Sequence, residues 1–302
     1  MRVQSCGASR TLKGVDRLAA FALAITSILG GALVPAGCGG KLAANRSPPS
    51  GATGNIDSGA VPPATDASEA DSPGDVTGEG SSSSAALRFD GVRAYLNLAA
   101  ASGAASEKAF SSEIWFRTTS LTGVLFEVYS SGMPGADRST FLRAGQVCFY
   151  VYTPAFSEVC TTGATLNDGA WHNVAATLGA AGQFVYVDGM LQGMDPAVTT
   201  SAFNWDTGFR VGYGYIGGNG PLVFFAGDID DVRVWSVQRT AAELAAGRGH
   251  SIDPATVGLQ GYWKLDESGT AKIAPDSTAA MNDGTLLGFS FNPSPWISPG
   301  AF

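Results

Sequence analysis

The feature that most constrains the fold of this chain is a pair of β-strand patterns with tight turns around them. Residues 171–178 and 184–187 are rich in β-favouring residues, and a glycine-bounded break at 179–182 separates them. Asn167-Asp168-Gly169 precedes the first run, and Asp188-Gly189 follows the second. Asn, Asp and Gly tolerate the left-handed backbone that a tight reversal needs. The stretch therefore predicts a β-hairpin followed by a further reversal.

Composition favours many short strands over helices. The chain has 302 residues with 40 glycines and 10% aromatic residues, which fits strands joined by tight turns better than helices. Its hydrophobic content of 45% is enough to bury a substantial core. The net charge of −8 opposes binding to phosphate backbones, because that binding needs clustered Lys and Arg. We therefore expect an all-β domain and no nucleic-acid partner.

Three signatures in this region resemble those of concanavalin A-like, laminin-G-like jelly-roll domains of bacterial surface proteins. They read W-H-N-V-A-A-T at residues 171–177, Y-V-D-G at 186–189 and G-D-I-D-D-V-R-V-W at 227–235. The resemblance implies an all-β fold, a two-sheet antiparallel jelly-roll sandwich, with one short helix near the carboxy-terminal part. It implies only a class of function and does not name a ligand.

The amino-terminal 37 residues have the pattern of a signal peptide. Residues 1–17 are basic, and residues 18–34 form an apolar run that contains only two polar side chains. A run of this length is marginal for spanning a bilayer, so a retained membrane helix is the weaker alternative. We expect the rest of the chain to lie outside the cytoplasm.

The small residues that precede Cys38 resemble the lipobox of bacterial lipoproteins, in which the cysteine is acylated and becomes the new amino terminus. Pro35 departs from that motif, which usually has Leu, Val or Ile at this position. Ordinary cleaved secretion is therefore an alternative to lipidation. In bacterial lipoproteins the residue after the acylated cysteine influences to which membrane the protein is sorted. Here that residue is Gly39 and not Asp, which suggests the outer membrane or the cell surface.

The segment after this cysteine has the composition of a disordered tether. Residues 39–84 contain no Phe, Tyr or Trp and are rich in Ser, Gly, Ala and Pro. Such a segment cannot bury enough apolar surface to offset its ordering entropy. We expect a tether over residues 38–84 and one folded domain over residues 85–302. That domain includes a carboxy-terminal extension from about residue 251, for which the start of a truncated second repeat is the alternative.

Two cysteines in the predicted domain are placed to form a disulfide bond. Cys148 and Cys160 are equidistant in sequence from Pro154, so a hairpin that turns there would place them opposite each other. The oxidising environment outside the cytoplasm favours a bridge over two buried thiols. We expect its role to be structural.

Two local patterns predict irregular features near the signature at 227–235. Strict alternation would put Ile229 and Val232 on opposite faces, so we expect a β-bulge at Asp230-Asp231. The sequence T-A-A-E at residues 240–243 is a capping box, and the helix that it starts should end by Gly247.

The sequence lacks the motifs of catalytic sites known on this and related folds. The glucanases that share the fold carry E-x-D-x-x-E on one strand, and this motif is absent, as are H-E-x-x-H and G-x-S-x-G. We interpret His172 as a strand residue beside Trp171. We expect a protein that is not an enzyme, with a degraded or unusual hydrolase as a minor alternative.

The family resemblance also implies a calcium site. Related domains often bind one calcium ion through an Asp of the I-D-D-V-R strand and oxygens near the start of the domain. By position this implies Asp230, with Asp231 as its neighbour and Asp90 as a possible partner. The alternative is that these residues cap turns or pair with Arg233 and Arg93.

Aromatic residues among glycines provide candidate ligand-binding positions. Trp205, Tyr213 and Tyr215 lie in predicted loops, and aromatic faces stack well on sugar rings. Packing at the rim of the sandwich is the alternative for each of them. We expect a binding module for carbohydrate or a surface polymer, with a role in adhesion. The second hypothesis is a structural or protein–protein interaction domain of the cell envelope without glycan affinity.

Overall fold

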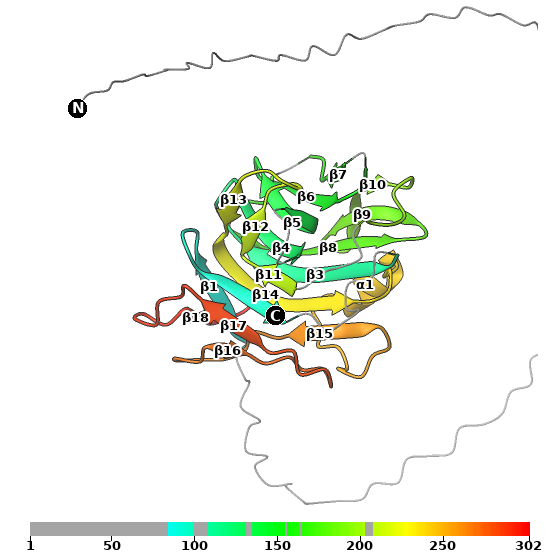
Figure 1. Cartoon of the computed structure of the whole chain (residues 1–302). Coiled ribbons are helices and arrows are strands. Elements are labelled where there is room, and N and C mark those ends of the chain that lie inside the picture. The colour runs from blue at the N-terminus through cyan, green and yellow to red at the C-terminus, as the bar shows by residue number, and fades with distance from the viewer. Residues whose placement is uncertain (1–83, 100–107, 131–134, 155, 164, 203–207) are drawn as a thin grey trace, which may run out of the picture. The chain divides into compact units, whose positions relative to one another are not determined.

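Short strands and tight turns build two antiparallel β-sheets in this protein (Figure 1). The computed structural model describes residues 84–99, 108–130, 135–154, 156–163, 165–202 and 208–302. Within these ranges the sheets have eight strands each and are accompanied by a two-stranded hairpin and a single short helix. The prediction of an all-β, two-sheet sandwich with one short helix is therefore confirmed. The predicted signal peptide, Cys38 and Trp205 lie outside the described residues.

The first sheet, named sheet A, has the strand order β10-β9-β8-β3-β14-β1-β18, with β15 also paired to β14. Its strands are β1 (Ala86–Asp90), β3 (Phe110–Arg117), β8 (Trp171–Gly179), β9 (Gly182–Val187), β10 (Met190–Asp195), β14 (Ala226–Trp235), β15 (Leu259–Trp263) and β18 (Trp296–Ile297). The predicted hairpin is formed by β8 and β9, and the reversal at Asp188-Gly189 leads into β10.

The second sheet, named sheet B, has the order β16-β17-β2-β11-β4-β5-β6-β7. Its strands are β2 (Tyr95–Ala99), β4 (Gly123–Tyr129), β5 (Ala136–Arg143), β6 (Gln146–Val151), β7 (Ser157–Cys160), β11 (Gly208–Val211), β16 (Ile273–Ala274) and β17 (Gly284–Leu287). A separate hairpin is formed by β12 (Tyr213–Tyr215) and β13 (Leu222–Phe224).

The inward-facing residues of both sheets form one large apolar core, which includes Phe116 and Ile229 from sheet A and Phe126 and Phe209 from sheet B. Strand β3 is buried along almost its whole length, including the outward-facing Glu113. The outer face of sheet A is thus partly covered by other parts of the chain.

The predicted β-bulge of sheet A and the predicted disulfide bond of sheet B are both present. The pairing of β14 with β3 shifts register between Asp230 and Arg233. The resulting bulge lets Ile229 and Val232 both be fully buried. At the edge of sheet B, Cys148 of β6 lies directly opposite Cys160 of β7, and the two form a disulfide bond with Cα atoms 4.0 Å apart.

Helix α1 (Ala241–Gly247) begins and ends where the capping pattern predicts. The Thr240 hydroxyl accepts a hydrogen bond from the Glu243 N–H at 3.3 Å, and the Glu243 carboxylate accepts one from the Thr240 N–H at 2.8 Å. Leu244 of the helix is buried against Ala175 and Tyr186 of sheet A. The helix therefore covers part of the outer face of that sheet.

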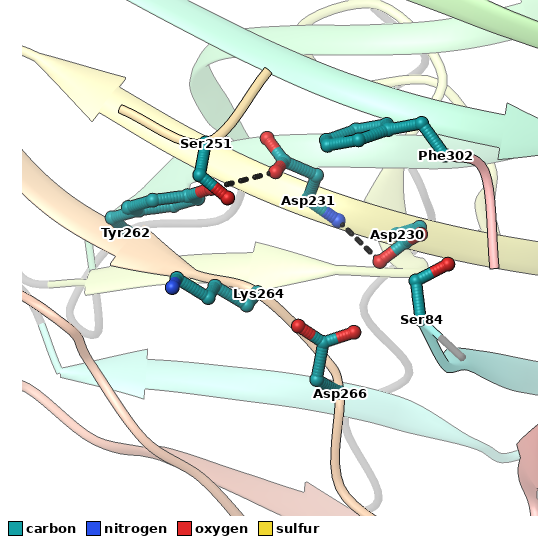
Figure 2. Close-up of a pocket in the computed structure, with 8 residues that line it drawn as sticks. All are labelled: Ser84, Asp230, Asp231, Ser251, Tyr262, Lys264, Asp266 and Phe302. Atoms are coloured by element: carbon teal, nitrogen blue, oxygen red, sulfur yellow. Dashed lines mark hydrogen bonds between the residues drawn. The ribbon is translucent and has the colours of Figure 1, made fainter. Parts of the chain in front are cut away.

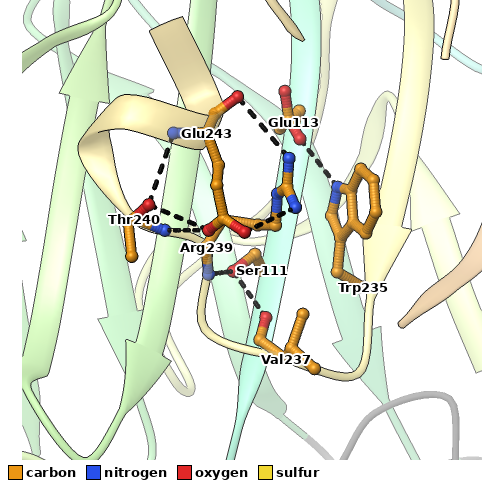
Figure 3. A network of polar contacts seen from close by, with 7 residues as sticks. All are labelled: Ser111, Glu113, Trp235, Val237, Arg239, Thr240 and Glu243. Atoms are coloured by element: carbon orange, nitrogen blue, oxygen red, sulfur yellow. Dashed lines mark hydrogen bonds and ion pairs between the residues drawn. The ribbon is translucent and has the colours of Figure 1, made fainter. Parts of the chain in front are cut away.

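A network of polar contacts fixes the segment before α1 to strands β3 and β14 (Figure 3). The Arg239 N–H donates to the Ser111 hydroxyl at 2.9 Å, and this hydroxyl donates to the Val237 carbonyl at 2.8 Å. The Arg239 guanidinium lies 4.1 Å from the centre of the Trp235 ring, whose N–H donates to Glu113 at 2.7 Å. These contacts explain how Glu113 is accommodated in a buried position.

The residues after position 251 extend both sheets. Strand β15 pairs with β14, and β18 pairs with β1, which adds to sheet A. Strand β17 pairs with β2 in sheet B. Tyr262 and Trp263 of β15 are fully buried. Across the described ranges, no helix has the length and apolar character needed to cross a membrane.

Candidate functional site

The bulge in β14 places two of the predicted calcium ligands at a polar pocket (Figure 2). The pocket has a volume of about 250 Å³. It is lined by residues of β14 together with residues from the amino-terminal and carboxy-terminal parts of the domain's sequence. Its lining consists of Ser84, Asp230, Asp231, Ser251, Tyr262, Lys264, Asp266 and Phe302. Most of these positions lie in the carboxy-terminal extension, so the local pattern around β14 could not identify them.

Asp230 is buried at this pocket and is held by main-chain donors. One of its carboxylate oxygens accepts the Asp231 N–H at 2.8 Å, and the other accepts the Ala301 N–H at 2.7 Å. Burial, together with the charges of Asp231 and Asp266, raises the pKa of Asp230 to about 8, although the two N–H donors act in the opposite direction. Its carboxyl group is therefore largely protonated at neutral pH.

Asp231 is also fully partnered. One oxygen lies 2.6 Å from the Arg233 guanidinium, and the other accepts the Tyr262 hydroxyl at 2.8 Å. Burial raises the pKa of Asp231, and the nearby Arg233 partly offsets that effect. Asp231 therefore pairs with Arg233, as the alternative to calcium ligation predicted.

Asp90 lies apart from the other two acids. It ends β1 opposite Ala226, so Asp230 is four residues further along β14, or roughly 13 Å away. One Asp90 oxygen accepts the N–H groups of Val92, Arg93 and Ala94, each at 2.9 Å. Asp90 thus caps the turn after β1. This is the role that was predicted from the sequence as the alternative to calcium ligation.

The structure separates Asp90 from the other two predicted calcium ligands, whereas Asp230 and Asp231 both line the polar pocket. Calcium takes six to eight oxygen ligands, so Asp230 and Asp231 alone would not complete a site, and calcium binding at this pocket stays a prediction. In the described part of the chain, the one group of three potential metal-ligating side chains that lie close together is Cys148, Glu158 and Cys160. Its two cysteines are joined in the disulfide bond.

The two predicted tyrosines lie on the β12–β13 hairpin, which folds over the outer face of sheet B. The Ser139 hydroxyl of β5 donates to the Tyr215 carbonyl at 2.8 Å, which fixes β12 to the sheet. A Cβ atom on Gly214 would lie 2.5 Å from the Glu127 carboxyl carbon, so this glycine faces the sheet. Because side chains alternate along a strand, Tyr213 and Tyr215 lie on the opposite face of β12 from Gly214.

Tyr213 belongs to a half-buried group of aromatic residues that we name the tyrosine patch: Tyr95, Tyr129, Tyr213 and Phe224. The ring of Tyr213 stacks on Phe224 with centroids 4.3 Å apart and lies 5.2 Å from the ring of Tyr95. The guanidinium of Arg210 lies 3.6 Å from the centre of the Tyr129 ring and 5.5 Å from that of Tyr213. Tyr215 makes none of these ring contacts in the described structure.

A buried acid supports the tyrosine patch from below. Glu127 of β4 is fully buried, and it accepts hydrogen bonds from Arg210 at 3.1 Å and from the Tyr215 N–H at 2.8 Å. Burial raises the pKa of Glu127 to about 7, against the lowering effect of these two donors. Glu127 was not predicted as a site residue from the sequence. Its one signal was a single acid within an apolar strand, which is unusual for a buried position.

Comparisons with known proteins agree with this architecture. A family model described as the concanavalin A-like lectin/glucanases superfamily matches residues 90–245, just over half of the chain. A solved candidate carbohydrate binding protein from Bacteroides ovatus is similar with a TM-score of 0.54 and 22% identity, over 71% of this chain and 60% of that one. At this identity the likeness concerns the fold.

Two other solved structures are less similar. Domains LG4-5 of the mouse laminin α1 chain give a TM-score of 0.41 at 22% identity, over 50% of this chain and 41% of that one. The SAP-like pentraxin from Limulus polyphemus gives a TM-score of 0.44 at 14% identity, over 62% of this chain and 94% of that one. No curated protein sequence matches the chain.

Proposed function

Because this chain belongs to the concanavalin A-like lectin/glucanase superfamily, we propose that its sandwich is a non-catalytic carbohydrate-binding module. The tyrosine patch on sheet B is the proposed binding surface. Aromatic faces at a partly exposed surface can stack on the apolar face of a sugar ring. The Tyr213–Phe224 stack with Arg210 beside it is the observation that carries this proposal.

Polar groups beside the rings would add hydrogen bonds to the sugar. Asn97 and Arg210 are register partners on β2 and β11, and both are partly exposed beside Tyr129. Asn97 accepts the Tyr129 hydroxyl at 3.1 Å, which leaves its amide donors for a ligand. A few fixed polar groups next to an aromatic surface are typical of small-ligand recognition.

The separation of Glu127 and Glu158, two of the acids on sheet B, is larger than that of a hydrolase pair. Glycoside hydrolases place two carboxyl groups roughly 5–9.5 Å apart. Glu127 and Glu158 lie on β4 and β7, three strand spacings or roughly 14 Å apart. Glu158 also forms an ion pair with Arg143. These two acids therefore do not have the separation of a hydrolase pair.

We expect Tyr213→Ala to weaken glycan binding by about tenfold, the loss that corresponds to one aromatic stacking contact. The full chain is first screened on a broad polysaccharide and glycan array, and the affinity for each hit is then measured for both proteins. Phe156→Ala is a matched control, because Phe156 is an exposed aromatic residue near the β6–β7 turn, outside the tyrosine patch. No saturable binding to any glycan, or equal losses in the two variants, would contradict the proposal.

A protein-binding role in the cell envelope is the second candidate function. Three apolar side chains of β10, an edge strand of sheet A, are exposed: Met190, Leu191 and Met194. Apolar groups that cluster at an exposed edge are typical of protein contacts. A blank glycan array would favour this function, and a pull-down from envelope extract would then be the next measurement.

We further propose that the protein is lipid-anchored at Cys38 and located outside the cytoplasm, at the outer membrane or the cell surface. The signal-like sequence and the small residues before Cys38 support this location. The Cys148–Cys160 disulfide also fits an oxidising compartment.

We expect cells that express the chain to incorporate a palmitate analogue into it, and Cys38→Ala to lose all of that label. The label would be detected on the immunoprecipitated protein after a gel. Equal labelling of the wild type and the variant, or no labelling of either, would contradict lipidation at this residue.

A further inference from the structure

A row of paired charges crosses the outer face of sheet A, on the opposite side of the sandwich from the tyrosine patch. Strand pairing places Trp171, Arg117, Asp228 and Arg88 next to one another on β8, β3, β14 and β1. Their inward-facing sequence neighbours on β3, β14 and β1 belong to the main core, so these four side chains lie on the outer face.

One buried carboxylate holds both guanidinium groups in this row. Asp228 is only 4% exposed. It accepts two N–H groups of Arg88 at 2.7 and 3.2 Å and two of Arg117 at 3.0 and 2.7 Å. Arg117 also stacks on Trp171, with its guanidinium 4.7 Å from the ring centre. Both arginines are thus fixed in place, and together with Asp228 they carry a net positive charge.

The donors of these arginines are only partly used. A guanidinium has five N–H donors, and Arg88 and Arg117 each use their Nε and Nη2 atoms on Asp228. Their Nη1 atoms make no hydrogen bond within the described structure. The side chain of Arg88 is 58% exposed and that of Arg117 31%, so these donors can reach a ligand.

The arginines line an open groove with a volume of about 410 Å³. Gly227 and Gly169 also line it and contribute no side chain. A Cβ atom on Gly227 would lie 2.3 Å from the Arg117 carbonyl oxygen, so only glycine fits at that position. The exposed hydroxyl of Thr119 makes no hydrogen bond among the described residues and adds one more donor.

We propose that this groove binds an oxyanion carried by a polysaccharide, either the carboxylate of a uronic acid or a sulfate ester. The groove offers free guanidinium donors and a positive charge, while both oxygens of its one carboxylate are already taken by N–H groups. An oxyanion accepts from several donors at once and carries the negative charge that matches the net positive charge of this groove. The planar guanidinium fork matches the geometry of such a group.

The test measures binding of the full chain to polygalacturonate, dextran sulfate and uncharged dextran at physiological ionic strength. We expect saturable binding to one or both charged polymers and none to dextran, and the polymer that binds identifies carboxylate or sulfate as the ligand group. Arg88→Gln should weaken this binding by about tenfold, because it removes one charge-assisted contact. Arg88→Lys should recover little of the loss, since a lysine keeps the charge without the fork.

Arg93→Gln is the matched control. Arg93 lies on the neighbouring turn, is 68% exposed, pairs with Asp90 and does not line the groove, so this variant makes the same charge change outside the proposed site. Equal losses in Arg88→Gln and Arg93→Gln would show general charge attraction and overturn the proposal, as would no binding to either charged polymer. The groove lies on sheet A and the tyrosine patch on sheet B, so a loss that is confined to Arg88→Gln is independent of the function proposed for sheet B.

Discussion

Replacing Cys148 and Cys160 together with alanine is expected to lower the free energy of unfolding by roughly 3 kcal/mol. The bond closes a loop between residues 12 positions apart, and its loss gives the unfolded chain more conformational freedom. The hairpin that it closes is the edge of sheet B and places Phe149 and Val151 in the main core. Loosening this edge therefore exposes part of the core.

The measurement is equilibrium unfolding in urea, followed by fluorescence, with and without a reducing agent. For a domain of this size the expected loss corresponds to a melting temperature lower by about 6–12 °C. Reduced wild type should unfold near the midpoint of the double variant, and the variant should not respond to the reducing agent. A wild-type curve that does not change on reduction would contradict a stabilising role for the bond.

The disulfide could be predicted because it depends on local information. Once Pro154 is taken as the turn of a hairpin, the register of the two flanking strands follows and places Cys148 opposite Cys160. The bulge at Asp230-Asp231 is local in the same way, because alternation must be broken if Ile229 and Val232 are both to be buried. Turn residues and strand periodicity act over a few positions, which a single sequence displays directly.

The candidate sites could be predicted only in part, because they depend on contacts between distant strands. Tyr213 was identified from its loop, but nothing near it indicated that Tyr95 and Phe224 would share its surface. The calcium interpretation grouped Asp90 with Asp230 by family position, whereas the pairing of β1 with β14 separates them. Such juxtapositions follow from sheet order and register, which local patterns do not determine.

The arginine groove on sheet A shows the same limit. Arg88, Arg117 and Asp228 come from three strands that are far apart in the chain and adjacent in the sheet. In the sequence each is one polar position in an alternating strand, which is ordinary for a solvent-facing residue. Only their register shows that one carboxylate orients two guanidinium groups.

Lowering the pH from about 8 to about 5 is expected to raise the melting temperature of the domain. Burial raises the pKa of Glu127 to about 7 and that of Asp230 to about 8. In this pH range the folded protein therefore keeps protons that the unfolded chain releases, so the folded state gains stability as the pH falls.

His172 contributes in the same direction. Its ring nitrogens lie 2.9 Å from Asp188 and 3.2 Å from Asp168, and these two acids raise its pKa although burial acts to lower it. The stabilisation that results from this raised pKa is fully present below the pKa of an unperturbed histidine. It is lost as the pH rises through the pKa of His172 in the folded protein. The pKa of Asp90 and that of Asp168 are lowered by backbone hydrogen bonds, so the gain should reverse in more acidic solution.

Glu127→Gln isolates the contribution of Glu127 to this pH dependence. A carboxyl pKa raised from 4.5 to about 7 corresponds to a free energy on the order of 3 kcal/mol between the two ends of the pH range. The Glu127 contribution alone therefore predicts a melting temperature about 5–10 °C higher near pH 5 than near pH 8. The variant keeps an acceptor for the Tyr215 N–H but no longer titrates, so its melting temperature should change less with pH.

Glu158→Gln is the matched control, because Glu158 lies on the same face of sheet B, paired with Arg143 and partly exposed. Its removal should leave the pH dependence of the melting temperature as in the wild type. The measurement is thermal unfolding by circular dichroism in buffers of equal ionic strength. A melting temperature that is constant or rises with pH across this range would show that Glu127 and Asp230 are charged at neutral pH. The tyrosine patch would then rest on an ionised Glu127–Arg210 pair.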